Sequence, residues 1–89
     1  MRYRGYIVGS ETRPGGRLVW KVRIKEAGNP HDGQKFTVAS IHGGLELARG
    51  LNVTFVLGTV DDETGEKVMR AVDVRLEGIP DVKPQQDEQ

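Results

Sequence analysis

The feature that most constrains the fold is a regular alternation of apolar and polar residues in two runs near the end of the chain. The first run extends from Leu51 to Leu57 and the second from Lys67 to Leu76. Apolar residues at every second position put one face of a strand in the core and leave the other face in water. The residues between the runs, DDETGE at 61–66, are polar and turn-forming. The pattern predicts a β-hairpin that needs the rest of the chain to cover its apolar face.

Three more strands are expected in the first half of the chain. The candidates are Tyr3–Val8, Arg17–Lys25 and Gln34–Ile41. They are separated by loops at 10–16 and 27–33, which contain the turn-forming sequences RPGG and NPHDG. Five short strands without a long helical pattern are typical of a small β-barrel. We therefore predict an all-β fold, a small five-stranded antiparallel barrel.

The alternation also predicts which side chains form the core. Trp20 is expected to point inward with its neighbours rather than to present its ring for stacking. Arg70 interrupts the apolar face of the last strand, so a β-bulge is expected near Met69–Ala71. The predicted core consists of Ile7, Leu18, Trp20, Val22, Ile24, Phe36, Val38, Val53, Phe55, Val72 and Val74.

Length and composition indicate one small domain. The chain has 89 residues and no cysteine, which removes disulfides and thiolate metal sites and fits a reducing compartment. No apolar run approaches the roughly 20 residues that span a membrane, and the N-terminus lacks the apolar region of a signal peptide. We expect a cytoplasmic protein without membrane contact. Residues 1–78 should form the barrel, and the polar residues 79–89 should be a disordered tail.

The residues that could support catalysis or metal binding are few. No Cys is present and no Ser-His-Asp arrangement is evident. The acidic cluster at 61–66 lacks the spacing of a calcium loop, and a solvated hairpin tip is the simpler interpretation. His31 and His42 have neither thiolates nor regular spacing, so they are interpreted as exposed loop residues. We therefore expect no enzyme, no metal and no cofactor.

Charge is unevenly distributed although the whole chain is neutral. Residues 1–25 contain seven Lys or Arg and one Glu, which gives +6, and residues 26–89 carry −6. Strand alternation directs many of these basic side chains to one outer face. Solvation of an exposed sheet face would explain the pattern equally well. The candidate nucleic-acid-binding residues on this face are Arg4, Tyr6, Arg17, Lys21, Arg23 and Lys35.

Residues 43–76 resemble the C-terminal half of a cold-shock domain, a small barrel of the oligonucleotide-binding (OB) fold. The matching residues are Leu45, Gly50, Val53, Phe55, Gly65, Ala71 and Val74. The resemblance implies a cold-shock-like OB barrel that binds single-stranded nucleic acid. The chain departs from that family on the binding face. Lys35 stands where the family has a stacking aromatic ring, and Thr37 stands where it has His.

Two functional classes follow from this face. The first is a single-stranded nucleic-acid-binding module, for RNA or DNA, that uses the basic face on the first three strands. With few rings, binding would be electrostatic, weakly sequence-selective and sensitive to salt. The alternative is a protein-interaction barrel. Its basic face would dock an acidic protein partner or another copy of the chain, which would make it a homo-oligomer.

Overall fold

The computed structural model describes residues 1–78. The predicted tail at 79–89 lies outside the described residues. The described chain forms five strands and contains no helix. The strands are β1 (Tyr3–Arg13), β2 (Arg17–Ile24), β3 (Lys35–Thr37), β4 (Asn52–Asp61) and β5 (Lys67–Leu76). The predicted all-β fold is confirmed, although β1 is longer than expected and β3 is shorter.

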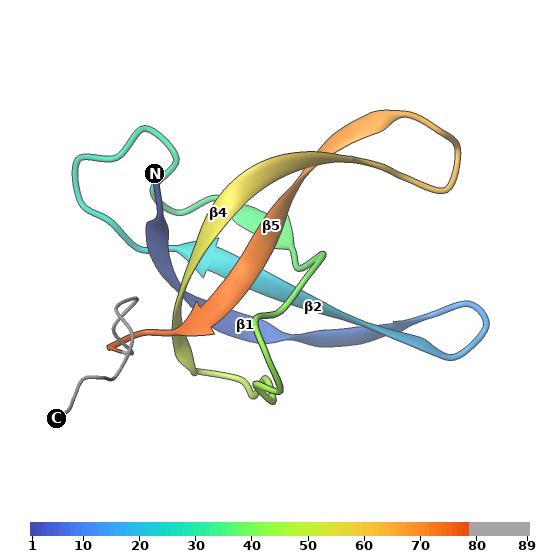
Figure 1. The fold of residues 1–89 in the computed structure, drawn as a ribbon, viewed down its shortest axis with the longest axis horizontal. Coiled ribbons are helices and arrows are strands. Elements are labelled where there is room, and N and C mark those ends of the chain that lie inside the picture. Colours follow the sequence, from blue (N-terminus) through green and yellow to red (C-terminus); the bar gives the residue numbers. More distant parts are fainter. Residues whose placement is uncertain (79–89) are drawn as a thin grey trace, which may run out of the picture.

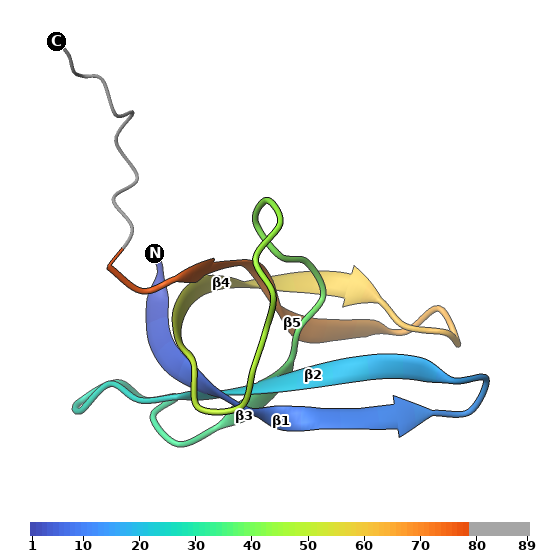
Figure 2. The same ribbon diagram turned by 90° about the horizontal axis from the view of Figure 1, so that it is seen from below.

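The five strands form one sheet in the order β3-β2-β1-β4-β5, with every neighbouring pair antiparallel. The segment after β3 closes the sheet against β5 through two parallel bridges, Val38 with Ala71 and Ile41 with Val74. Figure 2 shows the closed end of the barrel as a ring of backbone. This architecture fits a small OB-like barrel, and closure removes sheet edges at this end of the molecule.

The core lies inside this ring. Its fully buried side chains come from β1, β2, β4 and β5, and Phe55 is the largest of them. Trp20, Phe36 and Val38 were predicted in the core. They pack against it but are only half-buried, so the prediction is confirmed in part. The buried cluster is Ile7, Val22, Ile24, Val53, Phe55, Ala71 and Val74.

Two core predictions on β2 are wrong. Leu18 was expected inside but is 54% exposed, and Val19, which was not in the predicted core, is 8% exposed. Both residues lie in the part of β2 that extends past its pairing with β3, which begins at Lys21. Beyond the barrel, a strand no longer has a closed interior on one face and solvent on the other. The alternation of apolar and polar residues therefore does not predict which of these side chains is buried.

The predicted bulge in β5 exists, but at a different position. The pairing of β4 with β5 shifts register between Thr54 and Val56, opposite Asp73 and Val74. Asp73 has a φ of 55°, the one positive φ among the non-glycine residues described. The extra residue reverses the alternation, so the buried positions are Ala71 and Val74. Val72, predicted to lie in the core, is only half-buried for this reason.

Two hairpins extend from the same end of the barrel. One arm is formed by β1 and β2 and ends in a turn at 14–16, and the other is formed by β4 and β5 and ends at 62–66 (Figures 1 and 2). Residues 10–13 were expected in a loop, but they pair with β2 and lengthen the first arm. Within the described chain, no helix is long and apolar enough to cross a membrane.

Candidate nucleic-acid interface

Strand pairing brings basic residues and one aromatic ring into a row. Tyr6 on β1 pairs with Arg23 on β2, and Arg23 pairs with Lys35 on β3. On the other side of Tyr6 lies Asn52 of β4. Directly opposed residues in an antiparallel sheet present their side chains on the same face. Tyr6, Arg23 and Lys35 therefore form a continuous row across three strands.

The other predicted residues on this surface extend the row along the strands. Lys21 precedes Arg23 by two residues and pairs with Thr37, and Arg4 precedes Tyr6 by two. Residues two apart in a strand share a face. We call Arg4, Tyr6, Lys21, Arg23 and Lys35 the basic face.

The cations of the basic face are only weakly paired. Lys21 lies 3.9 Å from Glu11 and Arg4 lies 3.8 Å from Glu77, both near the limit of an ion pair. The Arg23 guanidinium donates to the carbonyl of Gly33 at 3.1 Å. Among residues 1–78, no carboxylate lies within 4.0 Å of the charged groups of Arg23 or Lys35. Much of the positive charge is therefore available to an anion.

Arg17 is set apart from the basic face. The structure places it at the far end of β2, in the arm, where its guanidinium lies 3.0 Å from the carboxylate of Glu63 on the other arm. Val19, which is nearly buried, separates it from Lys21. The expected strip through Arg17, Lys21 and Arg23 is therefore interrupted.

Two cations that the sequence analysis did not select lie beside the basic face. Lys25 lines a hollow of about 410 Å³ with Tyr6 and Arg23, and Arg49 lines one of about 530 Å³ with Lys21 and Lys35. Alternation along β2 pointed to Lys25. No local pattern pointed to Arg49, because its position depends on a tertiary contact. Its neighbour Gly50 donates to the carbonyl of Ile7 at 2.8 Å.

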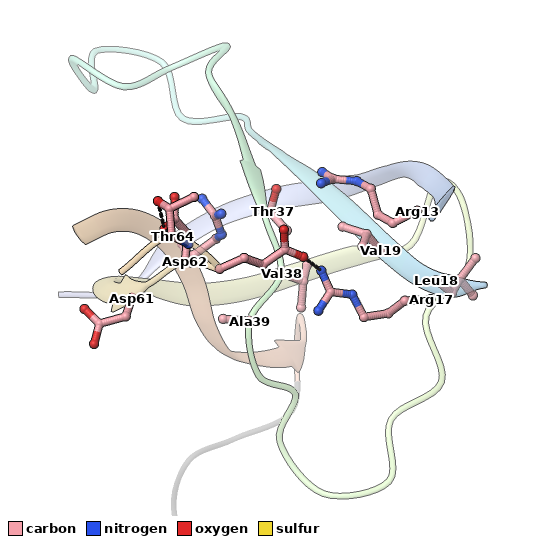
Figure 3. Close-up of a pocket in the computed structure, with 12 residues that line it drawn as sticks. Arg13, Arg17, Leu18, Val19, Thr37, Val38, Ala39, Asp61, Asp62 and Thr64 are labelled. Atoms are coloured by element: carbon pink, nitrogen blue, oxygen red, sulfur yellow. Dashed lines mark hydrogen bonds and ion pairs between the residues drawn. The ribbon is translucent and has the colours of Figure 1, made fainter. Parts of the chain in front are cut away.

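A cleft of about 440 Å³ lies between the two arms (Figure 3). Its walls carry both signs of charge: Arg13 and Arg17 come from the β1–β2 arm, and Arg70 lines the β4–β5 arm together with Asp61, Asp62 and Glu63. Its floor is formed by Thr37, Val38 and Ala39. The cleft is thus chemically different from the basic face, where cations predominate.

The acidic tip of the second arm is an ordered turn. Asp62 accepts hydrogen bonds from the Thr64 hydroxyl at 2.7 Å, the Thr64 amide at 2.8 Å and the Glu66 amide at 3.0 Å. The Thr64 hydroxyl contributes most to lowering the pKa of Asp62, and the two amides add to it. Asp62 therefore stays ionised at neutral pH.

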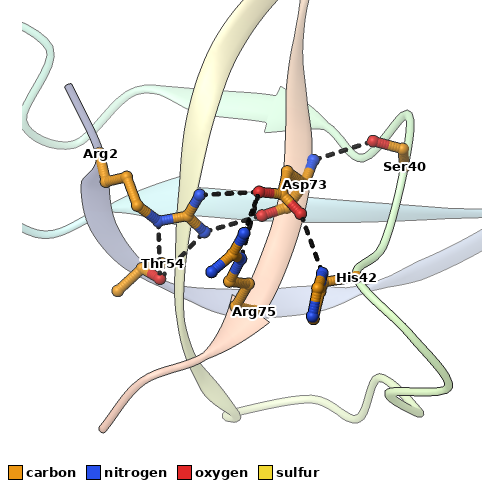
Figure 4. Close-up of polar contacts among 6 residues, drawn as sticks. All are labelled: Arg2, Ser40, His42, Thr54, Asp73 and Arg75. Atoms are coloured by element: carbon orange, nitrogen blue, oxygen red, sulfur yellow. Dashed lines mark hydrogen bonds and ion pairs between the residues drawn. The ribbon is translucent and has the colours of Figure 1, made fainter. Parts of the chain in front are cut away.

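Asp73 forms a second polar cluster beside the bridge between Ile41 and Val74 that closes the barrel (Figure 4). Its carboxylate receives hydrogen bonds from Arg2 at 3.0 Å and Arg75 at 3.1 Å, and its amide donates to the Ser40 hydroxyl at 2.8 Å. The Arg75 hydrogen bond is the largest cause of the lowered pKa of Asp73. His42 lies 3.5 Å from the same carboxylate. These contacts hold the bulged residue that closes the barrel.

The two histidines have structural contacts. His31 stacks edge-on against Tyr3 and Phe36, with ring centroids 5.9 and 6.4 Å away, so it covers one end of the core. The interpretation of His31 as a simple exposed loop residue was therefore incomplete. His42 belongs to the Asp73 cluster. In the part of the chain that the structure describes, no group of three His, Cys, Asp or Glu side chains could hold a metal ion.

In comparisons with protein-family models and with curated proteins, no match to this chain was found. Functional inference therefore rests on the residues and on the geometry of the fold. A fold of this kind supports many functions, so the surfaces carry the argument.

Proposed function

We propose that the protein is a single-stranded nucleic-acid-binding module, for RNA or DNA, related to cold-shock domains. The observation that carries the proposal is the continuous row Tyr6, Arg23 and Lys35 across β1, β2 and β3. In OB-type barrels, the faces of strands two and three carry the oligonucleotide. A positive surface that follows the phosphate backbone, combined with a ring for base stacking, suits a single strand.

The composition of the basic face determines the kind of binding expected. It provides four cations but only one aromatic ring, Tyr6. Stacking contributes about 1–3 kcal/mol per base, so a face with one ring obtains most of its affinity from phosphates. Phosphate contacts carry no sequence information directly. Binding is therefore weakly selective, and it weakens steeply as salt concentration rises.

The phosphate contacts are tested by removing two cations together. Lys21→Ala with Arg23→Ala should weaken the binding of labelled single-stranded oligonucleotides of every sequence in fluorescence anisotropy. It should also reduce the slope of log K against log salt by about 1–1.5, because each phosphate on a single strand contributes about 0.7. The matched control is Lys67→Ala with Arg70→Ala on β5, which removes the same charge away from the basic face.

The stacking contact is tested at Tyr6. Tyr6→Ala should reduce affinity with little change in the salt slope, because stacking releases no counterions. Tyr6→Phe keeps the ring and should bind like the parent protein. Both variants must have the same melting temperature as the parent protein, so that a loss of affinity is not due to unfolding.

Three results would contradict the proposal. One is an unchanged salt dependence in the Lys21/Arg23 variant. Another is an equal loss of affinity in the β5 control. The third is no binding by the parent protein in about 50 mM salt, a condition in which phosphate contacts are strong. In that last case the basic face would serve an acidic protein partner.

A further inference from the structure

The hollow of about 410 Å³ beside Tyr6 is lined by segments from four parts of the chain. Tyr6 of β1 pairs directly with Arg23 of β2 on one side and with Asn52 of β4 on the other. Directly opposed residues have Cβ atoms about 4.5–5.5 Å apart on the same face of the sheet. A flat ring that stacks on Tyr6 therefore has its edge within reach of the Asn52 side chain.

The two rims of this hollow are fixed by main-chain hydrogen bonds. The Gly33 amide donates to the carbonyl of Ile24 at 2.8 Å, and the Gly50 amide donates to the carbonyl of Ile7 at 2.8 Å. A Cβ atom at Gly33 or Gly50 would meet nothing within 4 Å, so no neighbouring side chain fills the space above either rim. The hollow has a volume in the range of small-molecule sites. It shares no lining residue with the cleft between the arms.

Asn52 brings unused hydrogen-bonding groups of both kinds to this hollow. Its amide carries two donor hydrogens and an acceptor oxygen. Among residues 1–78, no protein group bonds to this side chain. Its main-chain carbonyl accepts from the Glu77 amide at 3.0 Å, which fixes the backbone at the start of β4. Asn is depleted in strands, so strand propensity does not favour it at this position.

The charged groups around the hollow are either already bonded or better suited to phosphate. The Arg23 guanidinium donates to a main-chain carbonyl of the loop before β3 at 3.1 Å. The Asp32 carboxylate accepts from the Glu26 amide at 2.8 Å. Lys25 carries a point charge of the kind that binds phosphate without reading a base. The neutral amide of Asn52 is therefore the group best placed to read the edge of a base.

The donor and acceptor of a primary amide match adenine best among the four bases. Adenine presents its N6 amino group next to a ring nitrogen acceptor, N7 on one edge and N1 on the other. Asn bonds such a pair through both of its polar atoms. Both edges are accessible in a single strand. Cytosine has a matching pair on one edge only, and its smaller ring covers less of an aromatic side chain.

We propose that this hollow is a base-recognition subsite for adenine. The base stacks on Tyr6, and the Asn52 amide bonds its N6 amino group and the adjacent ring nitrogen. This inference rests on the proposed function of the basic face. It adds one selective position to a surface whose other contacts are to phosphates, which carry no sequence information directly.

The test measures the binding of three labelled hexanucleotides by fluorescence anisotropy. One contains only deoxythymidine, the second carries one central deoxyadenosine, and the third carries unsubstituted purine at that position. Purine keeps the ring for stacking but lacks the N6 amino group. The parent protein should bind the adenine probe at least about fivefold more tightly than the purine probe, in keeping with the discrimination that a bidentate Asn–adenine pair provides.

Asn52→Ala should remove this preference. The variant should bind the adenine and purine probes equally, while its affinity for the thymidine probe and its salt slope match those of the parent. Thr59→Ala is the matched control, because Thr59 is an exposed residue of the same strand that does not line the hollow. It should keep the full preference for adenine. Both variants should have the parent melting temperature, since both side chains are exposed.

A second measurement changes only the ligand and does not depend on the folding of a variant. Probes with 7-deazaadenine or 1-deazaadenine each lack one of the two ring nitrogens beside the amino group. Weaker binding of one of them by the parent protein supports the contact and identifies the edge that Asn52 reads. Binding of both analogues as tightly as adenine would overturn the proposal.

The proposal is also overturned if the parent protein binds the adenine and purine probes equally. The same holds if Asn52→Ala weakens all three probes by the same factor, since Asn52 would then contact the strand backbone or support the fold. If the parent binds the thymidine probe but does not distinguish adenine from purine, only this inference fails. If it binds none of the three in about 50 mM salt, the proposed function fails and the adenine subsite with it.

Discussion

The closed barrel and the two arms are built from the same strands but differ in what surrounds them. Within the barrel, β1 has β2 on one side and β4 on the other, and the closing segment joins β3 to β5. In the arms, each strand has one neighbour and a free edge. Phe55 is fully buried in the barrel, whereas Leu18 is largely exposed in the arm. Stability is therefore concentrated in the barrel, whereas free strand edges and exposed apolar side chains are concentrated in the arms.

The largest effect is expected in the core. Phe55→Ala should lower the free energy of unfolding by about 3–5 kcal/mol, because it removes the largest fully buried side chain and leaves a cavity. Leu18→Ala in the arm should stay within about 0.5 kcal/mol of the parent. Urea denaturation followed by circular dichroism measures both values. Equal losses at the two positions would remove the distinction between barrel and arm.

A smaller effect is expected at Gly5, where β1 and β2 approach closely. A Cβ atom at this position would lie 2.1 Å from the Arg23 carbonyl oxygen, so a main chain must move. Gly5→Ala should cost about 1–3 kcal/mol, the usual range for overpacking. Gly44→Ala is the control, since a Cβ there meets nothing within 4 Å. A parent-like unfolding midpoint for Gly5→Ala would show that the barrel adapts as freely as the arms.

The closure at Asp73 should give a pH-dependent effect. Hydrogen bonds from Arg75 and Arg2 lower the pKa of Asp73 below its usual value of 3.8. The ionised carboxylate therefore stabilises the fold fully above the unfolded pKa, and this contribution is lost as pH falls through the folded pKa. Asp73→Asn keeps a residue that tolerates positive φ but removes the charge.

The measurement for Asp73 is the melting temperature as a function of pH. We expect the parent protein to lose more stability than Asp73→Asn as pH drops below about 3.8. Glu46→Gln, in the exposed loop before β4, serves as the control and should follow the parent. Parallel pH profiles for the parent and Asp73→Asn would show that the carboxylate does not hold the closure.

The smallest effect is expected for the ion pair that bridges the arms. Arg17 and Glu63 are 62% and 80% exposed, and exposed pairs contribute roughly 0.2–1 kcal/mol. A double-mutant cycle with Arg17→Gln and Glu63→Gln should give a coupling energy in that range, and about 1 M salt should abolish it. A coupling above about 2 kcal/mol would mean that the arms are as firmly connected as the barrel.

The sequence predicted the hairpin of β4 and β5 well. Val53 and Phe55 lie at alternate positions between polar residues, and the polar turn at 61–66 connects the two strands directly. It also placed Tyr6, Arg23 and Lys35 on the outer face of the first three strands, since outward positions follow from the inward positions of Ile7, Val22 and Ile24. It failed where a residue's surroundings depend on distant segments. The bulge at Asp73 requires Arg2 and Ser40, which come from the start and the middle of the chain.

The sequence by itself determined that strands form, roughly where they begin, and which residues of β1, β2 and β3 share a face within the closed barrel. Those properties follow from periods of two residues and from turn chemistry, which are local. Only the tertiary structure decided where the barrel closes, how far the arms extend beyond it, and that Arg17 meets Glu63 rather than joining the basic face. Closure and inter-arm contact depend on strand register and on main-chain pairing between distant segments, which no local pattern of side chains specifies.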